Sequence, residues 1–99
     1  MKLRQVVFAP EAIEDLSDLY DYVAATSSEA TALAYLDRIR SFCQGFDLAS
    51  ERGTRRDDIR PGLRLVGFER RITLAFVVTK TRVIFLRVFY GGQNWQTRV

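Results

Sequence analysis

Apolar positions recur along the chain at two different spacings, and the change of spacing separates strands from helices. Residues 3–8 (Leu-Arg-Gln-Val-Val-Phe) are rich in β-branched and aromatic side chains, which favours a short strand. The run Ala9-Pro10-Glu11 then favours a helix start, since proline is tolerated in the first turn and acidic residues suit the helix dipole. Apolar residues three or four positions apart predict that this helix continues to about Ala25; they are Ile13, Leu16, Tyr20 and Val23, and Leu19 lies beside this stripe.

A second helix is predicted from about Glu29 to Phe46. Thr26-Ser27-Ser28 breaks the first pattern and supplies a candidate N-cap residue. The connection is only a few residues long, so the two helices should form an antiparallel hairpin. The apolar positions of the second helix are Ala32, Leu36, Ile39, Cys43 and Phe46.

Some apolar helix residues are left over after one buried stripe is assigned to each helix. They cannot all face one sheet, so we expect some of them to be open to a partner helix that binds in a groove. The left-over residues are Leu19, Tyr22, Leu33 and Phe42.

The second half of the chain has the pattern of a sheet. Residues 47–62 form a polar connector with glycine and proline breakers, and three strands are predicted at 63–68, 72–78 and 83–89. The tail should leave the sheet at Gly91-Gly92. The order β-α-α-β-β-β over residues 1–99 predicts a single α+β domain with two layers, in which a helix hairpin packs on a mostly antiparallel sheet.

Composition removes several classes of enzyme. The chain contains no histidine and a single cysteine, Cys43, so zinc hydrolases and catalytic triads that depend on histidine are excluded. We expect no metal and no cofactor. The apolar run at the start is too short for a signal peptide and ends at Pro10, and no run is long enough to span a membrane, so we expect a cytoplasmic protein.

Charge is distributed unevenly between the two halves of the chain. Residues 1–50 carry four basic and eight acidic side chains, a net charge of −4, whereas residues 51–99 carry eleven basic and four acidic ones, a net charge of +7. The overall charge is +3. A basic half on a small domain favours an anionic partner, either nucleic acid or an acidic protein.

Three stretches together resemble the ParE branch of the ParE/RelE toxin superfamily. The first is 8–16 (Phe-Ala-Pro-Glu-Ala-Ile-Glu-Asp-Leu) with Tyr20-Asp21-Tyr22-Val23 after it. The second is 56–64, where a Pro-Gly pair precedes a strand with an early arginine, and the third is the last strand with the residues after it, 82–91. The order and spacing of the three, which span nearly the whole chain, carry the resemblance.

The resemblance implies the toxin of a type II toxin–antitoxin system, neutralised by a ParD-like antitoxin. It implies DNA gyrase as the target for ParE-like toxins, and messenger RNA on the ribosome for RelE-like relatives. The chain departs from the family at its end, where Tyr90-Gly91-Gly92 stands in place of a His-Gly pair followed by basic residues. Our main hypothesis is a toxin that binds and poisons gyrase without catalysis of its own.

Two alternatives remain open at the level of sequence. The chain could be a ribosome-dependent endoribonuclease that uses Arg64, Arg87 and Tyr90, which match positions where RelE-like relatives place catalytic groups. Neighbouring antiparallel strands could bring the three together; otherwise the arginines are surface residues and Tyr90 covers the core. The chain could also be an inactive relative kept for its complex with the antitoxin and for operator regulation.

Candidate binding residues lie in the basic half. Arg55, Arg56 and Arg60 could pair with carboxylates or phosphates, because the guanidinium fork binds both in bidentate fashion. They could equally form a solvated loop neutralised in part by Asp57 and Asp58. Arg64, Arg87, Tyr90 and Trp95 complete the candidate surface for antitoxin or target, and we expect nucleic acid to be contacted only through those partners.

Overall fold

The structure is a computed structural model that describes residues 3–91. Its elements follow the predicted order β-α-α-β-β-β, with a 3-10 turn and one additional short strand between the second helix and the last three strands. The elements are β1 (Gln5–Phe8), α1 (Pro10–Thr26), α2 (Glu29–Gln44), η1 (Gly45–Asp47), β2 (Thr54–Arg55), β3 (Arg64–Phe68), β4 (Ile72–Val78) and β5 (Arg82–Tyr90).

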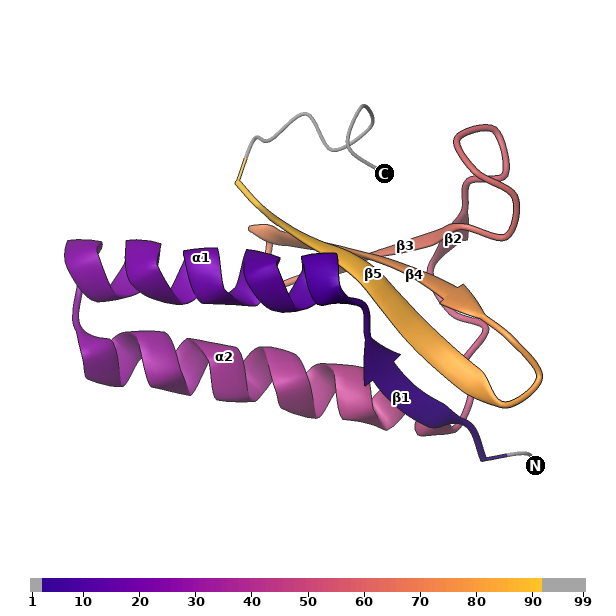
Figure 1. The fold of residues 1–99 in the computed structure, drawn as a ribbon, viewed down its shortest axis with the longest axis horizontal. Helices are drawn as coiled ribbons and strands as arrows, with labels where there is room; N and C mark the ends of the chain where they lie inside the picture. Colours follow the sequence, from indigo (N-terminus) through magenta and orange to yellow (C-terminus); the bar gives the residue numbers. More distant parts are fainter. Residues whose placement is uncertain (1–2, 92–99) are drawn as a thin grey trace.

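The strands form one sheet in the order β1-β5-β4-β3-β2. β1 pairs with β5 in parallel, and the other neighbours are antiparallel. The helices α1 and α2 lie side by side as a hairpin and cover one face of the sheet (Figure 1). The predicted α+β class and its two-layer architecture are therefore confirmed.

The main core lies between the helices and the sheet. Phe46, Phe76 and Phe85 are fully buried and contact one another with ring centroids 5.2 to 5.4 Å apart. Fully burying such a side chain contributes about 1.5–3 kcal/mol. Leu16 of α1 and Ile39 of α2 pack against this cluster, so the apolar stripes of both helices are used as predicted.

The connector differs from the prediction. Residues 47–62 were expected to be irregular, but Thr54–Arg55 pairs with Arg64–Leu65 and extends the sheet by one short strand. Gly53 permits this approach: its φ is +75°, and a Cβ there would lie 2.3 Å from the Leu65 carbonyl oxygen. The second helix also ends earlier than predicted, at Gln44, and Phe46 belongs to η1.

The burial of two residues on α1 also differs from the prediction. Ile13 was assigned to the buried stripe but is 57% exposed, and Ala12 is buried in its place. Leu19 was counted as left over but is buried. Tyr22 and Leu33 remain exposed as expected, whereas Phe42 is partly buried against Phe68.

Candidate functional site

The three residues of the nuclease alternative are not gathered at one place. Arg64 lies beside Phe76 and Tyr90 lies beside Ile72 in the register of the sheet. Those partners are four residues apart on β4, which corresponds to about 13 Å along the strand. Arg87 lies beside Ala75, on the face opposite to Tyr90, since Ile72 packs under the helices and Ala75 belongs to the cluster on the other face.

Arg87 is held by an ion pair with Asp15 of α1. Its Nε and Nη2 donate to Oδ2 and Oδ1 at 2.8 and 2.9 Å, and the two side chains are only 16% and 10% exposed. Oδ2 of Asp15 also accepts the backbone N–H of Val88 at 2.9 Å. β1 ends at Phe8, so Asp15 bonds to the edge of β5 beyond the point where the strand pairing stops.

This ion pair has an electrostatic consequence for Arg87. The hydrogen bonds that Arg87 donates to Asp15 raise the pKa of the guanidinium above its ordinary value and hold the side chain in one orientation. Its carbon Cζ also lies 5.0 Å from the centre of the Phe89 ring. Arg87 therefore joins α1 to β5, which sequence reasoning could not detect because Asp15 is 72 positions away.

Arg64 also makes an internal contact. Its Nη1 donates to the backbone carbonyl of Arg52 at 3.2 Å. Arg52 in turn donates to the carbonyls of Gly45 and Ala49 at 2.6 and 2.9 Å and lies over the Phe46 ring at 4.3 Å. Together these contacts hold the connector against the end of the helical layer.

The connector arginines fall into two groups. Arg55 pairs with Asp57 at 3.1 Å, and Arg56 makes a bidentate pair with Asp58 at 2.9 Å. Asp57 also accepts the backbone N–H of Gly62, and these hydrogen bonds lower the pKa of its carboxyl group. Arg60 is exposed, and no ion pair of its side chain is present within residues 3–91.

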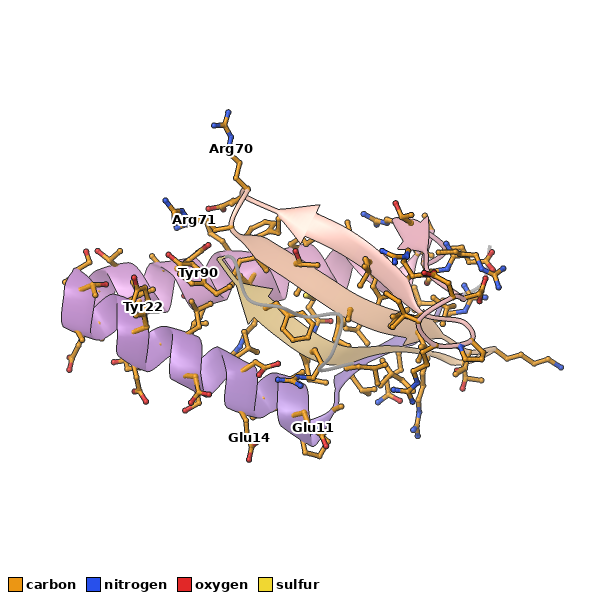
Figure 2. All side chains as sticks on the ribbon, turned by 90° about the horizontal axis from the view of Figure 1, so that it is seen from above. Glu11, Glu14, Tyr22, Arg70, Arg71 and Tyr90 are labelled. Atoms are coloured by element: carbon orange, nitrogen blue, oxygen red, sulfur yellow. The ribbon has the colours of Figure 1, made fainter. Side chains whose placement is uncertain are left out.

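Tyr90 belongs to a group of tyrosines over the helix hairpin. Its ring lies 5.5 Å from the ring of Tyr22 and 6.5 Å from that of Tyr35, and Figure 2 shows Tyr22 and Tyr90 on this side of the molecule. Burial raises the pKa of Tyr35, and Tyr90 acts in the same direction. Arg71 is near enough to oppose that shift, which places the turn between β3 and β4 close to the tyrosines.

An open groove of about 700 Å³ lies beside β1. It is mostly apolar, with Arg40 and Gln44 as polar lining from α2. β1 is an edge strand, so one side of its backbone has no strand partner among the described residues. The other lining residues come from β1, α1 and α2: Val6, Val7, Phe8, Ile13, Leu16, Ser17, Tyr20 and Leu36.

Comparisons with known proteins place the chain in a family. The family model described as "ParE toxin of type II toxin-antitoxin system, parDE" matches residues 6–95. The chain belongs to the ParE toxin family. No protein with curated annotation gives a significant match.

Two solved structures share the ParE toxin's fold. A chain of the chromosomal ParDE system of P. aeruginosa is 21% identical with a TM-score of 0.78, and the match covers 90% of this chain and 97% of that one. A chain of the RelBE2 toxin–antitoxin complex of Mycobacterium tuberculosis is 20% identical with a TM-score of 0.60, with coverage of 94% and 97%. At this identity the likeness shows the fold and leaves the target open.

Several expectations for this ParE toxin concern absences or residues outside 3–91. Trp95 lies outside the described residues, so its role as a binding residue stays a prediction. Within the described residues, no three metal-ligating side chains cluster. No helix there is both long and apolar enough to cross a membrane.

Proposed function

We propose that this ParE toxin acts by binding and poisoning DNA gyrase, and that a ParD-like antitoxin neutralises it. Membership of the ParE family and the fold shared with the ParDE chain of P. aeruginosa support the proposal. The observation that carries the choice of binding over catalysis is the dispersal of Arg64, Arg87 and Tyr90.

Cleavage of RNA places strict geometric demands on its catalytic groups. One group must take the proton of the 2′-hydroxyl, another must protonate the leaving oxygen, and cations must stabilise the charge between them, all within hydrogen-bond reach of one phosphate. Arg87 and Tyr90 lie on opposite faces of the sheet, and Arg87 is already paired with Asp15. This arrangement favours a toxin that acts through contact.

The groove beside β1 suits the antitoxin. It offers apolar lining next to an unpaired strand edge, and an antitoxin could fill it with an amphipathic helix or add a strand to β1. Ile13 stands 57% exposed in the lining, although an isoleucine on a helix of this kind is ordinarily buried. An apolar partner segment would remove that side chain from water.

The test of the function uses the purified chain with purified gyrase and relaxed plasmid. The proposal predicts that the toxin inhibits supercoiling and that an equimolar amount of its ParD-like antitoxin restores supercoiling. The same toxin should leave messenger RNA intact in a translating extract. Codon-specific cuts in ribosome-bound message that disappear in Arg64→Ala would instead establish the endoribonuclease. Arg64 is the better probe because substitution of Arg87 leaves Asp15 unpaired.

A further inference from the structure

The turn between β3 and β4 holds its backbone in an unfavourable conformation. Glu69 and Arg70 both have positive φ, +49° and +67°, in a region that L-residues other than asparagine and aspartate rarely adopt. Hairpin turns that need this conformation usually contain glycine or asparagine. Strain of this kind persists only where surrounding contacts enforce it, and it concentrates at functional sites.

A bidentate ion pair and a backbone hydrogen bond connect this turn to neighbouring elements. Arg38 of α2 donates to both carboxylate oxygens of Glu69 at 2.8 and 3.0 Å, and the guanidinium also lies 5.1 Å from the centre of the Tyr35 ring. The backbone N–H of Gly91 donates to the carbonyl of Arg71 at 2.8 Å and fixes the other side of the turn. The strained turn is thus tied both to the helix hairpin and to the end of β5.

In this arrangement the side chains of two arginines of the turn are exposed to solvent. Arg70 and Arg71 are exposed, and neither side chain has an ion pair within residues 3–91. Figure 2 shows Arg70 extending away from the body of the molecule, with Arg71 between it and Tyr90. Tyr22, which is 53% exposed, continues the same surface onto α1.

We propose that the toxin binds its target through a surface formed by Tyr22, Tyr35, Arg38, Arg70, Arg71 and Tyr90. This surface binds a protein segment that bears carboxylates. We refer to it as the tyrosine–arginine surface. The proposal rests on the proposed function, in which toxicity comes from binding. Tyrosine and arginine are the residues most enriched where interfaces concentrate their binding energy.

The chemistry of the surface favours an acidic protein segment over a nucleic acid. The pairing of Arg38 with Glu69 over the Tyr35 ring is an internal example of a carboxylate held in this environment, and Arg70 and Arg71 can each accept another in bidentate fashion. A nucleic acid carries charge along its whole backbone, so one that continued from Arg70 along α1 would meet repulsion, whereas a protein segment can bear carboxylates only opposite the arginines. The exposed side of α1 is acidic, with Glu11, Glu14, Asp18 and Asp21.

The surface is distinct from the groove assigned to the antitoxin. None of its six residues lines that groove. An acidic segment of the target could therefore be recognised at a place whose substitution leaves the groove unchanged, and toxicity can be separated experimentally from neutralisation.

The experiment compares two double charge reversals of equal size. Arg70→Glu with Arg71→Glu removes the displayed charges, and Lys80→Glu with Arg82→Glu makes the same change in the hairpin between β4 and β5, at exposed positions. Growth arrest after induction is measured for both, together with association of each purified protein with nuclease-treated gyrase. Circular dichroism and urea unfolding check the fold.

The first variant should lose growth arrest and bind gyrase about tenfold more weakly or worse, while the control keeps both activities. Undiminished growth arrest in the first variant overturns the proposal. If the wild type arrests growth without binding gyrase, the gyrase assignment fails and growth arrest alone decides the role of the surface. Loss of binding to bare DNA, with DNA-free gyrase unaffected, would assign the surface to nucleic acid and also overturn the proposal.

A single substitution at Arg70 separates the effect of backbone strain on stability from the effect of the side chain on target binding. Glycine accepts positive φ without cost, so Arg70→Gly should unfold at a higher urea concentration than the wild type. The same variant should arrest growth less strongly, because the displayed guanidinium is gone. Full toxicity in Arg70→Gly would contradict the proposed role of Arg70.

Discussion

At the scale of single residues, the bond between Asp15 and the edge of β5 is the contact that most clearly joins the two layers. One carboxylate accepts two hydrogen bonds from Arg87 and one from the backbone of Val88. Removing one member of a buried ion pair leaves the other charge without compensation. The sequence indicated an acidic helix face but not which of its carboxylates turns inward.

Asp15→Ala should therefore lower the free energy of unfolding by about 2–4 kcal/mol. Asp18→Ala, on the exposed side of the same helix, is the control and should change it by less than about 0.5 kcal/mol. Urea unfolding at neutral pH measures both. Equal stability of the two variants would mean that the pair with Arg87 contributes little.

Cys43 gives the stability of the fold a dependence on alkaline pH. Burial raises the pKa of its thiol from 9.0 to about 12. The folded state thus keeps the thiol proton in a pH range in which the unfolded chain releases it. The contribution of the buried neutral thiol to stability is therefore complete below pH 9 and is lost as the pH rises toward 12. The free energy of unfolding should fall by about 1.4 kcal/mol for each pH unit in that interval.

The measurement is a urea titration at several values between pH 7 and pH 10.5. Cys43→Ala should start from a lower stability because it leaves a cavity, but its stability should decline less steeply with pH. Parallel curves for the wild type and Cys43→Ala would show that the thiol does not titrate as its burial indicates.

At the scale of elements, the long segments with periodic apolar residues were predictable from sequence. Short segments, and features that depend on contact with another element, were not. The helices and the strands β3, β4 and β5 follow from apolar spacing and lie within one or two residues of their predicted bounds. β2 has two residues, too few to show an alternation of apolar and polar positions. Its pairing with β3 depends on the close approach of the Gly53 backbone to Leu65. Helical spacing assigned Ile13 to the core because it cannot tell which of two adjacent residues the sheet will cover.

The candidate sites show the same division. Pairing of Arg55 and Arg56 with Asp57 and Asp58 was one of the two possibilities that the sequence left open, and it is accessible to sequence analysis because all four are close in sequence. The separation of Arg87 from Tyr90 follows from their spacing, because residues three apart on a strand point to opposite faces of the sheet, and the pairing with β4 is regular from Arg87 to Tyr90. The partner of Arg87 could not be foreseen, since Asp15 lies on another element 72 positions away.

The groove beside β1 yields a prediction that uses two exposed apolar residues. Ile13→Lys should weaken antitoxin binding, because it places a charge in the apolar lining without disturbing the core. Leu33→Lys is the matched control, since Leu33 is 55% exposed on α2 and does not line the groove. Co-purification with a co-expressed ParD-like antitoxin gives the readout, and equal retention of the two variants would place the antitoxin elsewhere.

The connector yields a prediction about charge. Arg55→Glu, Arg56→Glu and Arg60→Glu together should slow association with the antitoxin or the target, most strongly at low salt. The fold should remain, because exposed ion pairs contribute little to stability. Stopped-flow or biosensor kinetics at two salt concentrations measure the effect. An unchanged association rate at low salt would show that the connector is only a solvated loop.

At the scale of the whole molecule, the two halves of the chain carry opposite net charge. The net charge of −4 belongs to the half with β1 and both helices, and the net charge of +7 belongs to the half with the connector and the other strands. In Figure 1 the first half supplies both helices and the edge strand β1, and the second half supplies the other strands of the sheet. The groove proposed for the antitoxin lies where β1 meets the helices, whereas Arg70 and Arg71 belong to the basic half. A toxin of this form can present different chemistry to its antitoxin and to its target.

The most direct test of the central proposal is whether the purified toxin traps gyrase on cleaved DNA. Gyrase, plasmid and toxin are incubated, the reaction is stopped with detergent and protease, and linear plasmid is quantified. Gyrase poisoning predicts linear plasmid that increases with toxin concentration and disappears when gyrase or the toxin is omitted. No linear plasmid, from a preparation that arrests growth when expressed, would contradict gyrase poisoning as the mode of action.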